Sequence, residues 1–201
     1  MLKGDLLKNI KVGIDAVDIS AIMGINKSKS AYNLYLEKIA LIEESKKSED
    51  IPDHESSEAT YWDCNAKETL SREFSIRSEK KVRKENKKLI DEEYDFIIGN
   101  IDRKIVGENA ILICKTENVF LPREWNGGEL PASYLLECQH YMRISKADKA
   151  YIASLIGGKK FVYKEVLRDE EVINMIIQIE KDFWFNNILK RVPPKKDNIC
   201  V

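Results

Sequence analysis

The chain has 201 residues, of which 43% are hydrophobic and 33% charged, and its formal net charge is −1. This composition is typical of a soluble globular protein, and the length suits one domain with a sizeable core. No apolar run approaches the roughly 20 residues of a membrane span, and the N-terminus lacks a signal-peptide core, so we expect a cytoplasmic protein without a membrane partner. The four cysteines form no CxxC pair, which argues against a disulfide framework or a zinc site. The near-zero charge gives no support for nucleic-acid binding, although a local basic groove can coexist with acidic flanks.

The N-terminal part of the chain has the apolar spacing of helices. This spacing predicts helices over residues 15–24, 31–42 and 61–79, with a short polar loop at 25–30. Residues 43–58 are charged, contain a proline and lack periodicity, so we expect a flexible acidic loop there.

A β-rich region follows, and then helices and strands alternate. The patterns predict an edge strand at 80–89, an apolar strand at 94–102, its partner at 110–116, a helix at 130–144, a hairpin of 151–156 and 160–166 around two glycines, and a helix at 169–189. This order implies a single α/β domain over residues 1–190, with a central mixed β-sheet flanked by helices and a C-terminal tail at 191–201.

One motif in the β-rich region carries chemistry. Asp102 stands in YDFIIGNIDR, and the apolar run AILICKTEN follows it after a short turn. An Asp, a turn and an apolar strand ending in Lys are typical of PD-(D/E)XK metal-dependent nucleases, which need Glu-x-Lys on the second strand. Side chains alternate across a strand, so residues two apart share a face. Lys115 is in place here, but Ile113 stands where the Glu belongs, and isoleucine cannot ligate magnesium.

Several longer blocks resemble one family within that superfamily. The blocks are KVGIDAVDISAIMGINKSKSAYNLYLEK, YWDCNAKETLSREF, GNIDRKIVGENAILICKTEN, PASYLLECQHYM and ADKAYIASLIGGKKFVYKEVLRDEEVINMIIQIEKDFW. In this order, over residues 11–185, they resemble YqaJ-type phage recombinases, relatives of lambda exonuclease. The resemblance implies a restriction-endonuclease-like fold and a phage or prophage origin in a bacterial cell. Active members are magnesium-dependent 5′→3′ DNA exonucleases that often form trimeric rings and work beside a single-strand annealing protein.

The chain departs from this family at its chemical positions. The family opens with Gly-Gly-Ser-Asp, of which Asp18 survives. A catalytic Glu of the family is Lys67 here, the Glu of Glu-x-Lys is Ile113, and the first Gln of Gln-x-Gln-His-Tyr is Glu137. Framework residues are kept while chemical ones are changed, which indicates a pseudonuclease.

What remains is a set of residues that the resemblance assigns to the site. These are Asp102, Lys115, Glu137 and Gln139, with Asp102 a doubtful metal ligand. One carboxylate is a poor magnesium site, because magnesium prefers several hard oxygen ligands. Lys67 could pair with Asp102 and occupy the place of the metal, and such a pocket could still hold a phosphate.

A second group of residues is a candidate for DNA or phosphate contacts. The resemblance assigns such contacts to the region of the NKSKS loop, and the candidates are Asp18, Lys27, Ser28, Lys29 and Lys67. The alternative is an ordinary solvated loop.

These observations leave three functional hypotheses. The first is a catalytically compromised protein without a cofactor that binds a host or phage protein, or DNA, for example as an inhibitor of a defence nuclease or a regulator of recombination. The second is a magnesium-dependent DNA exonuclease with a rearranged site of Asp102, Glu137, Lys115 and Glu68. The third is passive DNA binding through Lys67, Lys115 and the NKSKS loop. A homotrimer follows from the resemblance alone.

Overall fold

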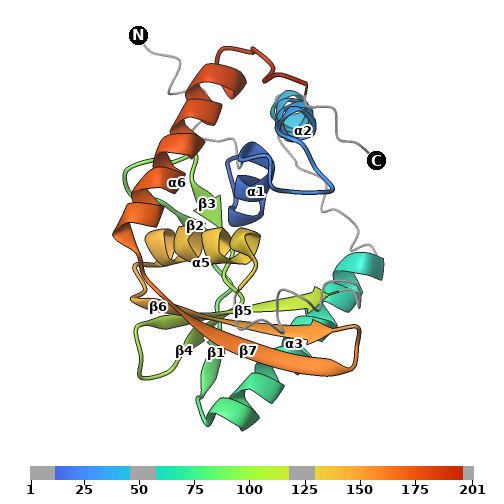
Figure 1. Ribbon diagram of the computed structural model, residues 1–201, viewed down its shortest axis with the longest axis vertical. Helices are drawn as coiled ribbons and strands as arrows, with labels where there is room; N and C mark the ends of the chain where they lie inside the picture. Colours follow the sequence, from blue (N-terminus) through green and yellow to red (C-terminus); the bar gives the residue numbers. More distant parts are fainter. Residues whose placement is uncertain (1–11, 46–57, 118–129, 197–201) are drawn as a thin grey trace.

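The computed structural model describes residues 12–45, 58–117 and 130–196 (Figure 1). Its helices are η1 (Ala16–Asp18), α1 (Ile19–Ile22), α2 (Ala31–Ser45), α3 (Glu58–Ser78), α5 (Ala132–Ser145), α6 (Glu170–Asp182) and the π-helical turn η2 (Phe183–Ile188). Its strands are β1 (Val82–Lys84), β2 (Leu89–Ile90), β3 (Ile98–Gly99), β4 (Arg103–Ile105), β5 (Ala110–Glu117), β6 (Lys149–Ile156) and β7 (Lys160–Leu167). No helix in these ranges is long and apolar enough to cross a membrane.

A mixed sheet with the strand order β1-β4-β5-β6-β7 forms the centre of the fold. Strands β5 and β6 are parallel, and the other neighbours are antiparallel. Two parallel strands cannot be joined by a tight turn, and helix α5 lies in the crossover between them. The predicted α/β fold with a central mixed sheet flanked by helices is therefore confirmed.

Strand β5 divides its side chains between two hydrophobic cores. Ile111 and Ile113 belong to the core that also contains residues of α5, whereas Leu112 and Cys114 belong to the core against α3. This alternation follows from the two-residue period of a strand. Lys115 continues the sequence of positions on the α5 side, at the point where the burial of β5 begins to decrease.

The predicted helices and the predicted β6–β7 hairpin are confirmed, with small shifts at their ends. The predicted acidic loop is partly wrong, because residues 43–45 form the last turn of α2 and Glu58 begins α3. Residues 46–57 lie outside the described residues. In the tail, Arg191 donates to the Glu43 carboxylate at 2.5 Å, and residues 197–201 lie outside the described ranges.

The predicted strand over 94–102 is wrong. Only β3 forms there, and it pairs with β2 in a separate two-stranded sheet. The strand that pairs with β5 is β4 instead. Packing explains the break: a Cβ on Gly99 would lie 2.7 Å from Tyr141 Cε1, so this stretch is held against α5 rather than in the main sheet. Asp102 consequently lies in the connection between β3 and β4.

The predicted edge strand over 80–89 is confirmed at its centre. Strand β1 is the outer strand of the main sheet and pairs with β4. Its length was overestimated, because Leu89 belongs to β2 in the small sheet.

Candidate functional site

Asp102 is held at the end of the central strands by the backbone of β5. Its Oδ2 accepts a hydrogen bond of 2.7 Å from the Cys114 N–H, and its side chain is only 13% exposed. This bond brings the carboxylate beside the residue that precedes Lys115. Asp102 therefore lies beside the C-terminal half of β5, as predicted.

Lys67 extends from α3 to the same carboxylate. Its Nζ lies 3.3 Å from Asp102 Oδ1 and 2.9 Å from Asp63 Oδ2. Burial lowers the pKa of Lys67, but Asp102 and then Asp63 raise it by more, so its pKa lies above the ordinary value and the amine is an ammonium. The Lys67–Asp102 ion pair that the sequence predicted is confirmed.

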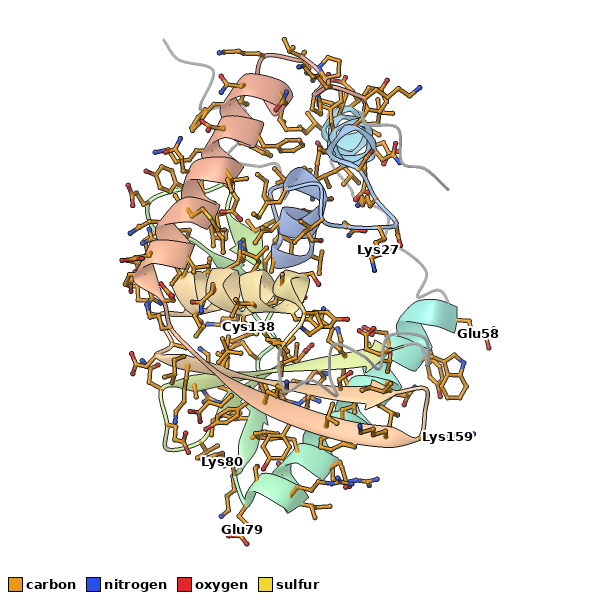
Figure 2. All side chains as sticks on the ribbon, viewed as in Figure 1. Lys27, Glu58, Glu79, Lys80, Cys138 and Lys159 are labelled. Atoms are coloured by element: carbon orange, nitrogen blue, oxygen red, sulfur yellow. The ribbon has the colours of Figure 1, made fainter. Side chains whose placement is uncertain are left out.

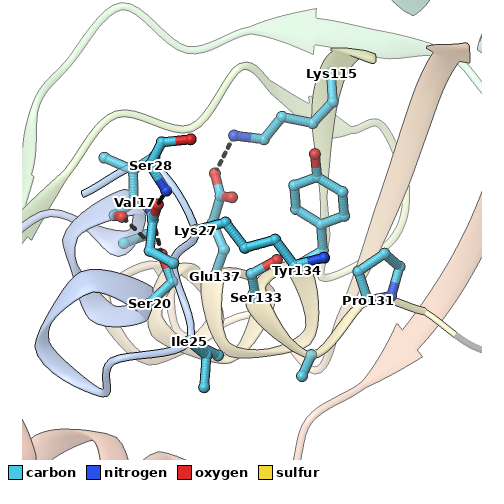
Figure 3. Close-up of a pocket in the computed structure, with 13 residues that line it drawn as sticks. Val17, Ser20, Ile25, Lys27, Ser28, Lys115, Pro131, Ser133, Tyr134 and Glu137 are labelled. Atoms are coloured by element: carbon cyan, nitrogen blue, oxygen red, sulfur yellow. Dashed lines mark hydrogen bonds and ion pairs between the residues drawn. The ribbon is translucent and has the colours of Figure 1, made fainter. Parts of the chain in front are cut away.

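A second ion pair lies on the α5 side of β5. Lys115 Nζ is 2.5 Å from Glu137 Oε1, and it lies 5.9 Å from the centroid of the Tyr134 ring (Figure 3). Burial raises the pKa of Glu137, and the Lys115 ammonium opposes that shift. Asp15 and Asp102 add to the increase, which places Glu137 within the electrostatic range of Asp102.

A pocket of about 440 Å³ opens beside the Lys115–Glu137 pair. Lys27 and Ser28 of the α1–α2 loop line it together with Ser20, and the first turn of α5 lines the opposite side (Figure 3). Lys27 lies at the outer end of that loop (Figure 2). The candidate site thus consists of two lysine–carboxylate clusters and one adjacent pocket with a mixed polar and apolar lining.

A model of the YqaJ-like viral recombinase domain matches residues 7–148. The chain belongs to the YqaJ-like viral recombinase family. The protein YqaJ of Bacillus subtilis (strain 168) is 41% identical over 200 residues, which cover 98% of this chain and 60% of that protein.

Solved structures show the same fold for this YqaJ-like chain. An alkaline exonuclease (LHK-Exo) from Laribacter hongkongensis superposes with a TM-score of 0.71 at 12% identity, over 94% of both chains. A phage-related exonuclease from Haemophilus somnus 129PT gives a TM-score of 0.62 at 15% identity, over 90% of this chain and 96% of that one. This YqaJ-like chain therefore has the same fold as these two exonucleases.

The acidic side chains that the structure describes around Asp102 and Glu137 are paired with cations of the chain itself. Within residues 12–45, 58–117 and 130–196, no group of three or more His, Cys, Asp or Glu side chains is placed to hold a metal ion. Asp102 and Glu137 each contact a lysine ammonium, and Glu68 accepts from Arg103 at 2.5 Å. Ile113 is 2% exposed and lies in the core with Tyr141. The donor set therefore does not fit the hard-oxygen cage that magnesium requires.

Three of the candidate site residues of this YqaJ-like chain do not line the pocket. Gln139 donates to Leu167 O at 2.8 Å and accepts from Asp169 N at 3.0 Å, so it joins α5 to the end of β7. Asp18 is buried against Lys38 on α2, and Lys29 pairs with Glu37 on the same helix.

Sequence reasoning missed two residues that complete the surroundings of Glu137. Tyr141 lies one turn beyond Glu137 on α5 and donates to Asp15 Oδ1 at 2.9 Å. Tyr134 lies one turn before it and borders both the pocket and Lys115. Their positions at i−3 and i+4 from Glu137 put all three on one face of the helix, and that spacing was the available signal.

Removal of Lys115 is expected to destabilise the protein more than removal of its partner. Lys115→Met would leave Glu137 buried without its cation and should lower the free energy of unfolding by about 2 kcal/mol, less than a fully buried pair because Lys115 is partly exposed. Glu137→Gln leaves an ammonium that water can reach and should cost less than about 1 kcal/mol. Urea unfolding of both variants and of the double variant measures this asymmetry. A larger cost for Glu137→Gln would contradict it.

Proposed function

We propose that this chain is a non-cleaving member of the YqaJ-like family that acts by binding a partner macromolecule. The observation that carries the proposal is that Lys67, at the position of a family carboxylate, forms ion pairs with Asp102 and Asp63. Hydrolysis by this type of site relies on carboxylates that hold metal ions, which activate water and neutralise developing charge. With its carboxylates engaged by lysines, the site lacks the ligands for that chemistry.

The pairing also bears on the kind of partner. Lys67, Lys115 and Lys29 all contact carboxylates, so much of their positive charge is compensated within the protein. Affinity for DNA depends mainly on cations that neutralise phosphates. With the net charge of −1, this favours a protein partner over DNA. Inhibition of a defence nuclease and regulation of a recombination complex are functions that such binding would serve.

The direct test is an assay on linear 5′-phosphorylated duplex DNA with Mg²⁺ or Mn²⁺. We expect no degradation by the unmodified protein, at the same background level as Asp102→Ala. Asp95→Ala removes an exposed carboxylate outside the site and serves as a matched control. Degradation that Asp102→Ala abolishes and Asp95→Ala retains would contradict the proposal.

That result would support the second candidate function, a magnesium-dependent exonuclease with a rearranged site. The observation in its favour is that Glu137, Lys115 and Asp102 lie in one region at the end of β5. Passive DNA binding is tested separately by fluorescence anisotropy with labelled duplex at 50 and 200 mM salt. Tight binding that weakens steeply with salt would favour DNA over a protein partner.

A further inference from the structure

Lys67 lies between two acidic side chains that come from different parts of the chain. Asp63 precedes Lys67 by one helical turn on α3, so both side chains project from the same face of the helix. Asp102 comes from the connection between β3 and β4. The ammonium lies 2.9 Å from Asp63 and 3.3 Å from Asp102, and it thereby links α3 to the central sheet.

Both carboxylate oxygens of Asp102 have a partner within the protein. One carboxylate oxygen contacts the Lys67 ammonium, and the other accepts from the backbone of Cys114. Both oxygens are therefore engaged in a side chain that is 13% exposed. A buried carboxylate requires a cation or hydrogen bonds to stay charged, and Lys67 provides the cation from within the chain.

We propose that the Lys67 ammonium is a tethered substitute for a divalent cation, which holds Asp63 and Asp102 together and keeps metal ions out of the site. The inference rests on the proposed function, because a protein that cleaves DNA with magnesium at this site would need the space that Lys67 occupies. The Lys67 ammonium carries one charge and lies 2.9 and 3.3 Å from the two carboxylate oxygens, whereas magnesium requires about 2.0–2.1 Å and octahedral coordination. The two cations therefore cannot share these carboxylates.

The inference predicts that the folded state gains affinity for divalent cations when Lys67 is replaced. In Lys67→Glu, the carboxylates at positions 63, 67 and 102 would lie close together. Repulsion among them would make the stability of the variant depend on a bound cation. With a Kd of about 1 mM, addition of 10 mM MgCl₂ should raise its Tm by roughly 3–6 °C. The Tm of the unmodified protein should change by less than about 1 °C, because no new ligand binds to its folded state.

The experiment compares Tm values in EDTA and in 10 mM MgCl₂ or MnCl₂ for the unmodified protein and three variants. Lys146→Glu is the matched control: it makes the same change of charge at an exposed lysine whose ammonium lies 2.6 Å from Glu92. Lys67→Met removes the ammonium without adding a ligand, and the divalent cation should recover part of its lost stability. This variant decides the question should Lys67→Glu not fold under either condition.

Each outcome bears on the inference. A Tm increase in the Lys67 variants that Lys146→Glu and the unmodified protein lack would support it, as would folding of Lys67→Glu in MgCl₂ but not in EDTA. An equal increase in the unmodified protein, or no larger increase in the Lys67 variants than in Lys146→Glu, would overturn it. The second outcome, together with absent DNA cleavage, would overturn the role of Lys67 and leave the proposed function standing. Cleavage by the unmodified protein would overturn the proposed function.

Discussion

Replacement of His140 by alanine is expected to lower the free energy of unfolding by about 3–5 kcal/mol, because it leaves a buried carboxylate without its cation. His140 Nδ1 lies 2.7 Å from Glu180 Oε1, and Nε2 lies 2.9 Å from the Ile98 carbonyl oxygen. Both partners accept hydrogen bonds, so both ring nitrogens carry protons and the ring is an imidazolium. The side chains of His140 and Glu180 are each 1% exposed, so bulk water does not reach the pair in the unmodified protein.

The same pair makes stability depend on pH. Burial lowers the pKa of His140, but Glu180 and the hydrogen bonds raise it by more, to about 9, above the ordinary 6.5. The folded state therefore binds this proton more tightly than the unfolded state does. The resulting stabilisation is fully present below about pH 6.5 and is lost as the pH rises through about 9, a decrease of roughly 3 kcal/mol.

Urea unfolding of the unmodified protein and of His140→Gln, from pH 6 to pH 10, measures this dependence. We expect a clear decrease for the unmodified protein and a much flatter profile for His140→Gln. Glu171→Gln, at an exposed position near the start of α6, should retain the decrease and controls for general effects of charge. Identical pH profiles for the unmodified protein and His140→Gln would contradict the assignment of the imidazolium.

Removal of the Lys38 amine is expected to cost a similar amount, about 3–5 kcal/mol. Lys38 Nζ lies 2.6 Å from Asp18 Oδ2, and the two side chains are 9% and 4% exposed. Asp18 Oδ2 also accepts from the Asp15 N–H at 3.0 Å, which closes the turn that presents Asp15 to Tyr141. In Lys38→Met the buried Asp18 would lose its cation, and the loop beside the pocket would lose its anchor to α2.

The comparison with an exposed pair makes this prediction specific. Lys29→Met breaks the contact between the loop before α2 and Glu37 of that helix, and we expect a cost below about 1 kcal/mol because both partners are solvated. Combining Lys38→Met with Asp18→Asn should recover part of the loss, since it also removes the buried charge. Denaturant midpoints for the four proteins measure these differences. A cost for Lys38→Met no larger than that for Lys29→Met would show that Asp18 is not held in this way.

Asp18 and Gln139 have partners that the sequence did not predict. Both stand at positions that the family resemblance assigns to the site, yet their polar groups bond to Lys38 and to the backbone near β7. The ion pair between Lys67 and Asp102 was predicted correctly: Lys67 lies near the middle of α3, and its ammonium reaches Asp102 in the connection before β4. The partners of Asp18 and Gln139 belong to no motif with them, so no signal in the sequence indicated these contacts.

The strand error around Gly99 has a related cause. The run from 94 to 102 has the apolar character of a continuous strand, but Gly99 packs against Tyr141 of α5, and the chain leaves the sheet before Asp102. This packing is invisible to a local pattern, because the two residues are more than 40 positions apart.

The amino-acid sequence alone is sufficient to establish the helices, the β6–β7 hairpin, the family and the loss of two carboxylates. Periodicity and motif spacing are properties of residues that are neighbours in the sequence. The ion pairs of the site became apparent only in the folded structure. The Lys67–Asp102, Lys115–Glu137 and Lys38–Asp18 pairs each join two different elements of the fold. The strength and consequence of each pair depend on burial, and burial exists only once the sheet and helices have packed.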